Sequence, residues 1–214
     1  MAQGLDIAGR RSPPSALTAL IDWGERTMLF VLFLLLAERL WPSFGRAPVN
    51  SLLLAGESLA VGFIVFRRAS EVVSVRPIEW LVALAGTLPS LLFAPGGMRI
   101  APAGLAAGLM LAGLLIQLSG KMFLRRSFGM AAANRGVKRG GAYRFVRHPI
   151  YLGYMTTWLG FVLINFEARN VALAIFASMM QVVRISFEER LLGADAAYRA
   201  YAGEVRFRLV PGVF

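Results

Sequence analysis

Six long apolar segments constrain the fold of this chain more than any other feature. They cover about residues 17–41, 52–66, 78–93, 100–118, 150–166 and 171–185. Most are slightly shorter than the ~20 residues that cross a bilayer, so flanking residues or locally thinned lipid must complete each crossing. A lone apolar strand would leave its backbone groups unpaired in lipid, and the period-two alternation of a membrane strand is absent from the sequence. We therefore predict an all-α, polytopic integral membrane protein with about six transmembrane helices.

The composition supports this prediction and excludes several classes of site. Of the 214 residues, 57% are hydrophobic and only 16% are charged, against about 25% charged in an ordinary soluble domain. The formal net charge of +11 favours acidic partners or an anionic membrane surface. No recognised nucleic-acid module is present, so nucleic acid is not an expected partner. The absence of cysteine and the single histidine exclude disulfides, thiolate metal sites and sites with two imidazole ligands, and no metal is expected.

The basic residues are distributed unevenly among the joints between these segments. All but four of the 23 Lys and Arg residues lie near the N-terminus, in the second and fourth joints, or from Arg184 onward. The four exceptions are Arg39, Arg46, Arg99 and Arg169. Because basic residues concentrate in cytosolic loops, both termini and the long joint at residues 121–149 are predicted to be cytosolic, which in a bacterium means an inner-membrane protein. Anionic lipid is the expected partner at that face.

One polar stretch, from Lys121 to Tyr151, interrupts the apolar pattern and contains GGAYRFVRHPIYLG. Its last part includes His148 and Pro149. Proline suits the first turn of a helix and holds the preceding residue out of helical geometry. A helix is therefore predicted to begin at His148, and its free N–H groups and partial positive charge suit a carboxylate or a phosphate.

Two adjacent carboxylates, Glu188 and Glu189, follow the sixth apolar segment. Carboxylates at a membrane interface are costly unless they pair with a cation or reach water. A ligand with both an anionic and a cationic group would complement the helix N-terminus and this pair together. The amino-acid part of S-adenosylmethionine has both groups, and the molecule adds a sulfonium and an adenine. The two carboxylates could also pair simply with Arg184 or Arg190 within one helical turn.

Together these motifs resemble a known superfamily. GGAYRFVRHPIYLGY, then EERLL about forty residues later, then Tyr198, Tyr201 and RLVP at residues 208–211 are similar to the isoprenylcysteine carboxyl methyltransferases and their phospholipid methyltransferase relatives. The similarity covers about residues 110–211. It implies an integral-membrane enzyme that uses S-adenosylmethionine to methylate a lipid or lipid-linked acceptor. The chain would then comprise a flexible cytosolic N-terminus (1–16), N-terminal transmembrane helices (17–99) and a cofactor-binding core with a cytosolic tail (100–214).

Carried over position by position, the resemblance implies three groups of site residues. The cofactor-binding group comprises Tyr143, Arg147, His148, Pro149, Tyr151, Gly153, Glu188 and Glu189. The candidate catalytic group comprises His148, Glu188 and Glu189. The candidate substrate-binding group comprises Tyr201, Glu204, Arg206 and Arg208.

Three places in the sequence depart from the family pattern. Ala142 replaces a proline, residues 195–197 replace a Phe-Gly pair, and Glu204 stands where the prenylcysteine enzymes have an arginine. A carboxylate acceptor would be repelled by Glu204, whereas an amine headgroup such as phosphatidylethanolamine would be attracted. We therefore expect an amine-bearing or other non-carboxylate lipid, unless Arg206 or Arg208 takes the place of the missing arginine.

Plainer roles for several of these residues remain open. His148 could only cap a helix, the basic residues between positions 121 and 147 could only set topology, and Glu57 inside the second segment could serve helix packing. A small-xxx-small pair along the fourth segment also suggests close helix packing, and its candidates are Gly104, Gly108 and Gly113.

Two other functions fit parts of the sequence. An NADPH-dependent membrane reductase of the sterol type could use the basic loop to hold the 2′-phosphate. A non-catalytic scaffold or small transporter is the alternative of another class, and Glu57 would be its first indication.

Overall fold

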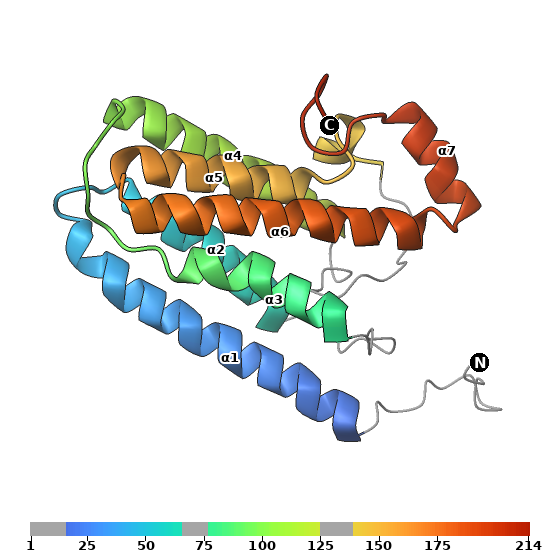
Figure 1. Ribbon diagram of the computed structural model, residues 1–214, viewed down its shortest axis with the longest axis horizontal. Helices are drawn as coiled ribbons and strands as arrows, with labels where there is room; N and C mark the ends of the chain where they lie inside the picture. Colours follow the sequence, from blue (N-terminus) through green and yellow to red (C-terminus); the bar gives the residue numbers. More distant parts are fainter. Residues whose placement is uncertain (1–15, 66–76, 125–138) are drawn as a thin grey trace.

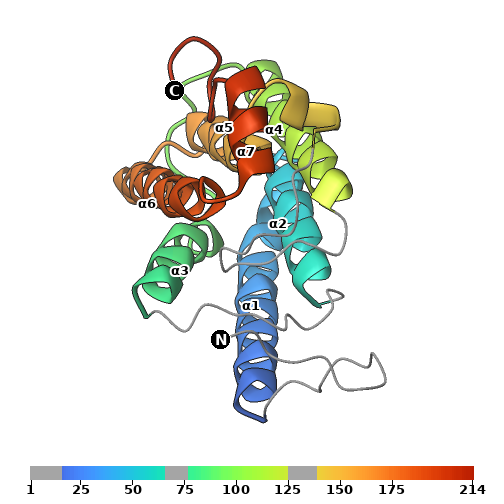
Figure 2. The ribbon, with the colours of Figure 1, turned by 90° about the vertical axis from the view of Figure 1, so that its right-hand side faces the viewer.

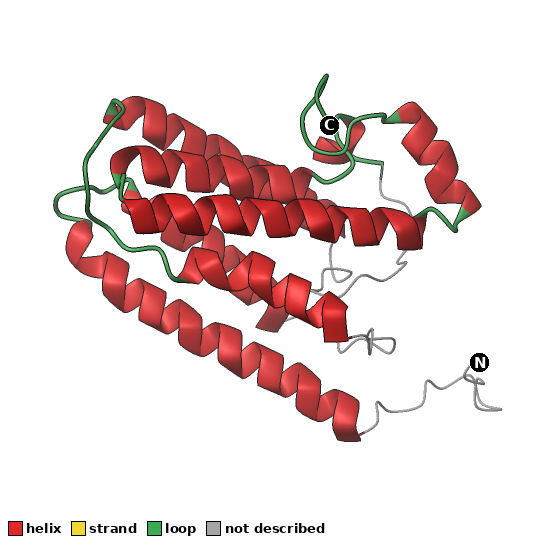
Figure 3. Cartoon of the chain, in the orientation of Figure 1, coloured by secondary structure: helices red, strands yellow, loops and turns green. Residues whose placement is uncertain are grey.

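Helices make up the regular structure of the described part of the chain. The computed structural model describes residues 16–65, 77–124 and 139–214. Its long helices are α1 (Ala16–Leu40), α2 (Asn50–Val65), α3 (Pro77–Leu91), α4 (Ala103–Leu124), α5 (Pro149–Ile164) and α6 (Ala168–Leu192). Shorter elements are the 3-10 turns η1 (Trp41–Ser43) and η3 (Gly141–Arg144) and the helix α7 (Ala196–Glu204). Within these ranges no strand forms, which confirms the all-α prediction (Figure 3).

The helices differ from the predicted segments in three places. Helix α6 continues to Leu192, so Glu188 and Glu189 lie on its last turns rather than after it. Helix α7 was not predicted, because its sequence AAYRAYAGE is short and carries no strong apolar period. Helix α4 also continues to Leu124, past the predicted end at residue 118, and the remaining long helices coincide closely with their apolar segments.

Two of the described helices, α4 and α6, are long and apolar enough to cross a membrane. Helix α5 and the Leu81–Leu91 part of α3 are apolar but shorter. At 1.5 Å per residue, the 16 residues of α5 extend about 24 Å, less than the ~30 Å hydrocarbon core. Membrane association therefore rests on α4 and α6, and six crossings stay a prediction.

The long helices run side by side, with α4, α5 and α6 forming one layer over α1, α2 and α3 (Figures 1 and 2). Helix α4 packs mainly on α5, α3 on α6, and α1 on α2. One end of the bundle holds η3, the first turn of α5, the last turns of α6, and α7, and we call it the site end. The start of α1 lies at the same end, so the arrangement is consistent with the predicted sidedness.

Helices α4 and α5 approach each other closely at small residues. A Cβ atom added to Gly160 would lie 2.7 Å from the carbonyl oxygen of Ala106, and one added to Gly113 would collide with the backbone of α5. Gly104 and Gly108 have no atom within 4 Å of the corresponding position. The predicted close packing is therefore confirmed at Gly113 and wrong at Gly104 and Gly108, which face away from the neighbouring helices.

Two buried ionisable residues, Glu57 on α2 and Lys121 on α4, influence each other electrostatically. Lys121 belongs to α4 and is fully buried, so its prediction as part of a cytosolic loop was wrong. Its Nζ donates to Gln117 Oε1 at 3.2 Å and lies 4.9 Å from the ring centroid of Tyr154. Glu57, 5% exposed, interacts electrostatically with Lys121. A compensated pair inside the bundle suits the packing role proposed for Glu57.

The α4–α5 contact makes a prediction about two glycines in the bundle. Gly160→Ala should lower the thermal stability of the detergent-purified protein by about 1–3 kcal/mol, because the new methyl group overpacks the helix crossing. Gly108→Ala is the matched control, since alanine there meets open space and should raise stability slightly through helix propensity. Equal melting temperatures for the two variants would contradict the described crossing.

Candidate functional site

The site begins where α5 starts. His148 occupies the N-cap position and Pro149 the first turn, as the sequence predicts. The His148 side chain makes no capping hydrogen bond, so the plain capping role is wrong. Its imidazole instead faces the end of α6, with Nε2 at 2.7 Å from Glu189 Oε1 and Nδ1 at 3.6 Å from Glu188 Oε2. The two motifs, separated by about forty residues in the sequence, therefore meet directly.

The C-terminal segment is held against the start of α5 by backbone hydrogen bonds. The N–H of Arg147 donates to the carbonyl of Phe207 at 2.9 Å, and that of His148 donates to the carbonyl of Arg208 at 2.8 Å. Two consecutive backbone hydrogen bonds thus tie residues 147–148 to residues 207–208. This pairing fixes Arg206 and Arg208 beside the site.

Helix α7 brings two tyrosines to the same region. Asp195 caps this helix by accepting a 2.7 Å hydrogen bond from the N–H of Ala197, which gives the unusual residues at 195–197 a structural role. Tyr198 donates to Glu189, and Tyr201 donates to the backbone carbonyl of Tyr143 at 2.8 Å. The helix is therefore tied both to α6 and to η3.

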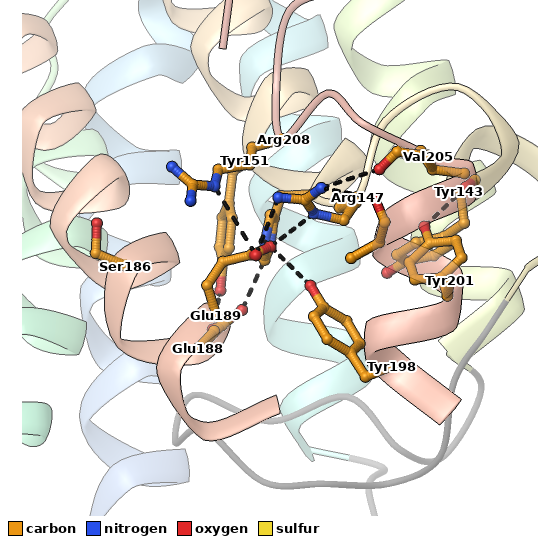
Figure 4. A network of polar contacts seen from close by, with 12 residues as sticks. Tyr143, Arg147, Tyr151, Ser186, Glu188, Glu189, Tyr198, Tyr201, Val205 and Arg208 are labelled. Carbon is orange, nitrogen blue, oxygen red and sulfur yellow. Dashed lines mark hydrogen bonds and ion pairs between the residues drawn. The ribbon is translucent and has the colours of Figure 1, made fainter. Parts of the chain in front are cut away.

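Glu189 is the most heavily bonded group of the site (Figure 4). Arg147 donates to both of its oxygens, from Nε at 2.9 Å and from Nη2 at 3.0 Å. Tyr198 and His148 each reach Oε1 at 2.7 Å, and Arg208 Nε lies 3.8 Å from Oε2. A carboxylate has about four lone-pair positions, so the protein itself nearly saturates this one.

Glu188 accepts fewer hydrogen bonds from the protein than Glu189 does. Its Oε1 accepts from the hydroxyl of Tyr151 and lies 3.4 Å from Arg184 Nε, the helical neighbour expected from the sequence. Among the described residues, the nearest polar partner of its Oε2 is His148 Nδ1, at 3.6 Å. The side chain of Glu188 is 18% exposed. This oxygen therefore keeps capacity for a further donor.

Arg147 is fixed by more than its carboxylate partner. Its Nη1 donates to the backbone carbonyls of Val205 and Arg206, each at 3.0 Å. The guanidinium group thus bridges α6 and the segment that follows α7. Since its donors are used inside the protein, Arg147 acts here as a structural cross-link.

The electrostatic environment changes the protonation of the groups outside the helical spans. Burial lowers the pKa of His148, but the nearby carboxylates of Glu188 and Glu189 outweigh burial and leave that pKa above its ordinary value. Burial and the hydrogen bond to Glu189 raise the pKa of Tyr198, and burial raises the pKa of Tyr201 to about 12. His148 therefore favours the charged form, and both phenols stay protonated near neutral pH.

Other predicted site residues lie at the margin of this network or outside it. Tyr143 is buried in η3, and Gly153 faces α4, where an added Cβ would lie 2.6 Å from Gln117 Cγ. Glu204 forms an exposed ion pair with Arg139 at 2.8 Å.

Sequence reasoning missed two members of the arrangement. Tyr198 was part of the quoted motif but was not assigned to the site, although its position one helical turn before the predicted Tyr201 was an available signal. The partnership of Arg139 with Glu204 left no such signal, because 65 residues separate them.

Residues 104–196 match the family model for phospholipid methyltransferase. This segment contains both motifs that meet at the site. The match confirms the resemblance to that superfamily. No curated protein matches the chain. A methyltransferase family implies a methyl donor, and the apolar helices α4 and α6 fit a membrane-associated enzyme.

The charged state of His148 predicts a pH dependence of stability. A raised pKa in the folded protein means that this contribution is complete below the unfolded value of about 6.5 and is lost as pH rises through the folded value. The melting temperature should therefore fall as the pH rises above about 6.5, and His148→Gln should remove that component. No second histidine is present to mimic the effect. An identical pH profile in the variant would contradict the assignment.

Proposed function

We propose that this protein is an S-adenosylmethionine-dependent methyltransferase that acts on a membrane lipid with an amine-bearing headgroup. The observation that carries the proposal is the direct contact of the two motifs within the matched segment. His148, at the start of α5, lies 2.7 Å from Glu189 at the end of α6. The buried polar network lies at one end of the helix bundle. At such an end a polar cofactor from the aqueous side could meet a lipid from the membrane.

The residues at the site end fit the amino-acid part of S-adenosylmethionine. A zwitterion needs a carboxylate for its ammonium group and a cation or N–H donors for its carboxylate. Glu188 provides an oxygen with free acceptor capacity, and the N-terminus of α5 provides the partial positive charge of a helix end near it. Tyr151, whose ring stacks on His148 with centroids 5.8 Å apart, adds an aromatic surface.

The two carboxylates therefore divide their roles in this proposal. Glu189 holds Arg147, His148 and Tyr198 together and has little remaining capacity. Glu188 is the group that would accept the ammonium of the cofactor. His148 acts as a positioning residue, since its imidazole lies between the two carboxylates and its pKa is raised.

The chemical task left to the protein is alignment and exclusion of water. S-adenosylmethionine, when bound, supplies a methyl group already activated by a positively charged sulfur. The protein must hold the acceptor nucleophile in line and keep the site dry. An amine acceptor must also lose a proton before its nitrogen can form the new bond, and that proton would pass to a carboxylate of this site or to water.

Glu204 no longer supports the preference for an amine headgroup, and the family match replaces it as the support. Glu204 was expected to repel a carboxylate acceptor, but Arg139 pairs with it and neutralises its charge. The match to the phospholipid methyltransferase model favours a phospholipid over a prenylcysteine. We keep the amine headgroup as the acceptor on that ground.

Anionic lipid at the site end belongs to the same proposal. Arg144 and Arg206 are exposed there and could contact lipid phosphates. Residues 125–138, which contain much of the predicted basic cluster, lie outside the described residues.

Binding of S-adenosylhomocysteine to the purified protein tests the cofactor assignment. Glu188→Gln should weaken binding by about ten- to a hundredfold, because a charge-assisted hydrogen bond is lost. Glu189→Gln should instead lower the melting temperature, since Arg147 and His148 lose their shared partner. Glu167→Gln, an exposed change at the opposite end of the bundle, is the control. Binding of NADPH in place of S-adenosylhomocysteine would favour the reductase, and binding of neither would favour a scaffold or transporter.

The acceptor is tested with labelled S-adenosylmethionine. Phosphatidylethanolamine should become labelled, and a farnesylcysteine analogue should not. Labelling of the farnesylcysteine analogue alone, abolished by Arg206→Ala or Arg208→Ala, would instead assign a carboxylate acceptor held by those arginines.

A further inference from the structure

The C-terminal segment forms an open depression beside Glu189. Its volume is about 300 Å³. Three arginines line it, namely Arg147, Arg206 and Arg208. Its apolar lining includes Phe207, Val213 and Phe214. The depression is thus both cationic and partly apolar, and it adjoins the carboxylate pair through two of its arginines.

The positive charge of this depression is only partly compensated. Glu189 is the carboxylate that Arg147 and Arg208 approach, and Arg147 already uses its donors on Glu189 and on backbone carbonyls. The side chain of Arg208 is 41% exposed and stays 3.8 Å from that carboxylate. Arg206 is exposed and has no ion pair recorded with any residue that the structure describes. Two guanidinium groups therefore have donors available for an anion.

The surroundings favour an anion that carries apolar chains. Val213, on the depression, is 81% exposed, and Phe207 is 37% exposed. Phe145, which follows η3 at the same end of the bundle, is 71% exposed. Exposed apolar side chains beside arginines suit the interface between lipid headgroups and acyl chains. A freely soluble anion would gain nothing from these residues.

We propose that Arg206 and Arg208 bind the phosphodiester group of the lipid acceptor. Guanidinium groups match phosphate oxygens in a two-pronged geometry, and Arg208 lies between the depression and Glu189. A phosphate held here would direct a headgroup amine, linked to it by a short carbon spacer, toward the Glu188–Glu189 pair. This inference rests on the proposed function and adds a recognition site for its substrate.

The test measures binding of short-chain phosphatidylethanolamine to the full-length purified protein by calorimetry. Arg206→Gln and Arg208→Gln should each weaken that binding by about tenfold, the loss of one charge-assisted contact. Arg99→Gln removes the same charge from an exposed position in the connection between α3 and α4, outside the depression, and should leave the affinity unchanged. A long-chain primary amine without phosphate should bind all four proteins equally.

Each other outcome has a distinct meaning. Equal phosphatidylethanolamine affinity in all variants would overturn this inference while S-adenosylhomocysteine binding and methyl transfer, which support the proposed function, persist. Weakened S-adenosylhomocysteine binding with unchanged lipid binding would assign the depression to the cofactor. Tight binding of inorganic phosphate without lipid binding would replace the lipid with a free phosphate. Arginine-dependent lipid binding without any S-adenosylhomocysteine binding would keep the phosphate site and refute the methyltransferase.

Discussion

The carboxylate of Glu189 is the interaction on which the site end depends. It accepts hydrogen bonds from Arg147 before α5, from His148 at the start of α5 and from Tyr198 on α7. Residues 147–148 and α7, which are separated in the sequence, thus converge on one group at the end of α6. The Arg147 and Glu189 side chains are only 8% and 14% exposed, so breaking the pair would leave a buried charge uncompensated, at a cost on the order of 3–5 kcal/mol.

Compensation of charge also explains how polar residues enter an otherwise apolar bundle. Asp22 and Arg26 pair at 2.7 Å within α1, and Glu57 interacts with Lys121 between α2 and α4. Each pair removes the penalty of an isolated ion in a low-dielectric surrounding. The second pair also links α2 to α4, which belongs to the segment that matches the family model. The N-terminal helices are therefore joined to the site-bearing helices by specific polar contacts as well as by apolar packing.

The sequence was sufficient for the parts of this structure that follow local rules. Apolar segments of near-bilayer length predicted six long helices, and the proline after His148 predicted where α5 begins. Local rules could not place Lys121, because Glu57 and Tyr154, which help to compensate its buried charge, lie on other helices. Nor could they show that Glu204 is neutralised by Arg139, because that pairing depends on how η3 and α7 are brought together. The pairing of polar residues that are distant in the sequence therefore could not be predicted from the sequence alone.

The two carboxylates accept different numbers of hydrogen bonds from the protein. This difference allows such a site to be both stable and open to a ligand. A carboxylate that must bind a ligand cannot also be the group that holds the structure together, because ligand exchange would then loosen the fold. Here Glu189 carries the structural contacts, whereas Glu188 Oε2 has its nearest recorded partner, within the described chain, at 3.6 Å. Adjacent positions on α6 point both groups into the same network, so the rigid one positions the available one. In the proposed function the two neighbouring glutamates are therefore not redundant, because Glu189 holds the surrounding segments together and Glu188 is left to accept the ligand.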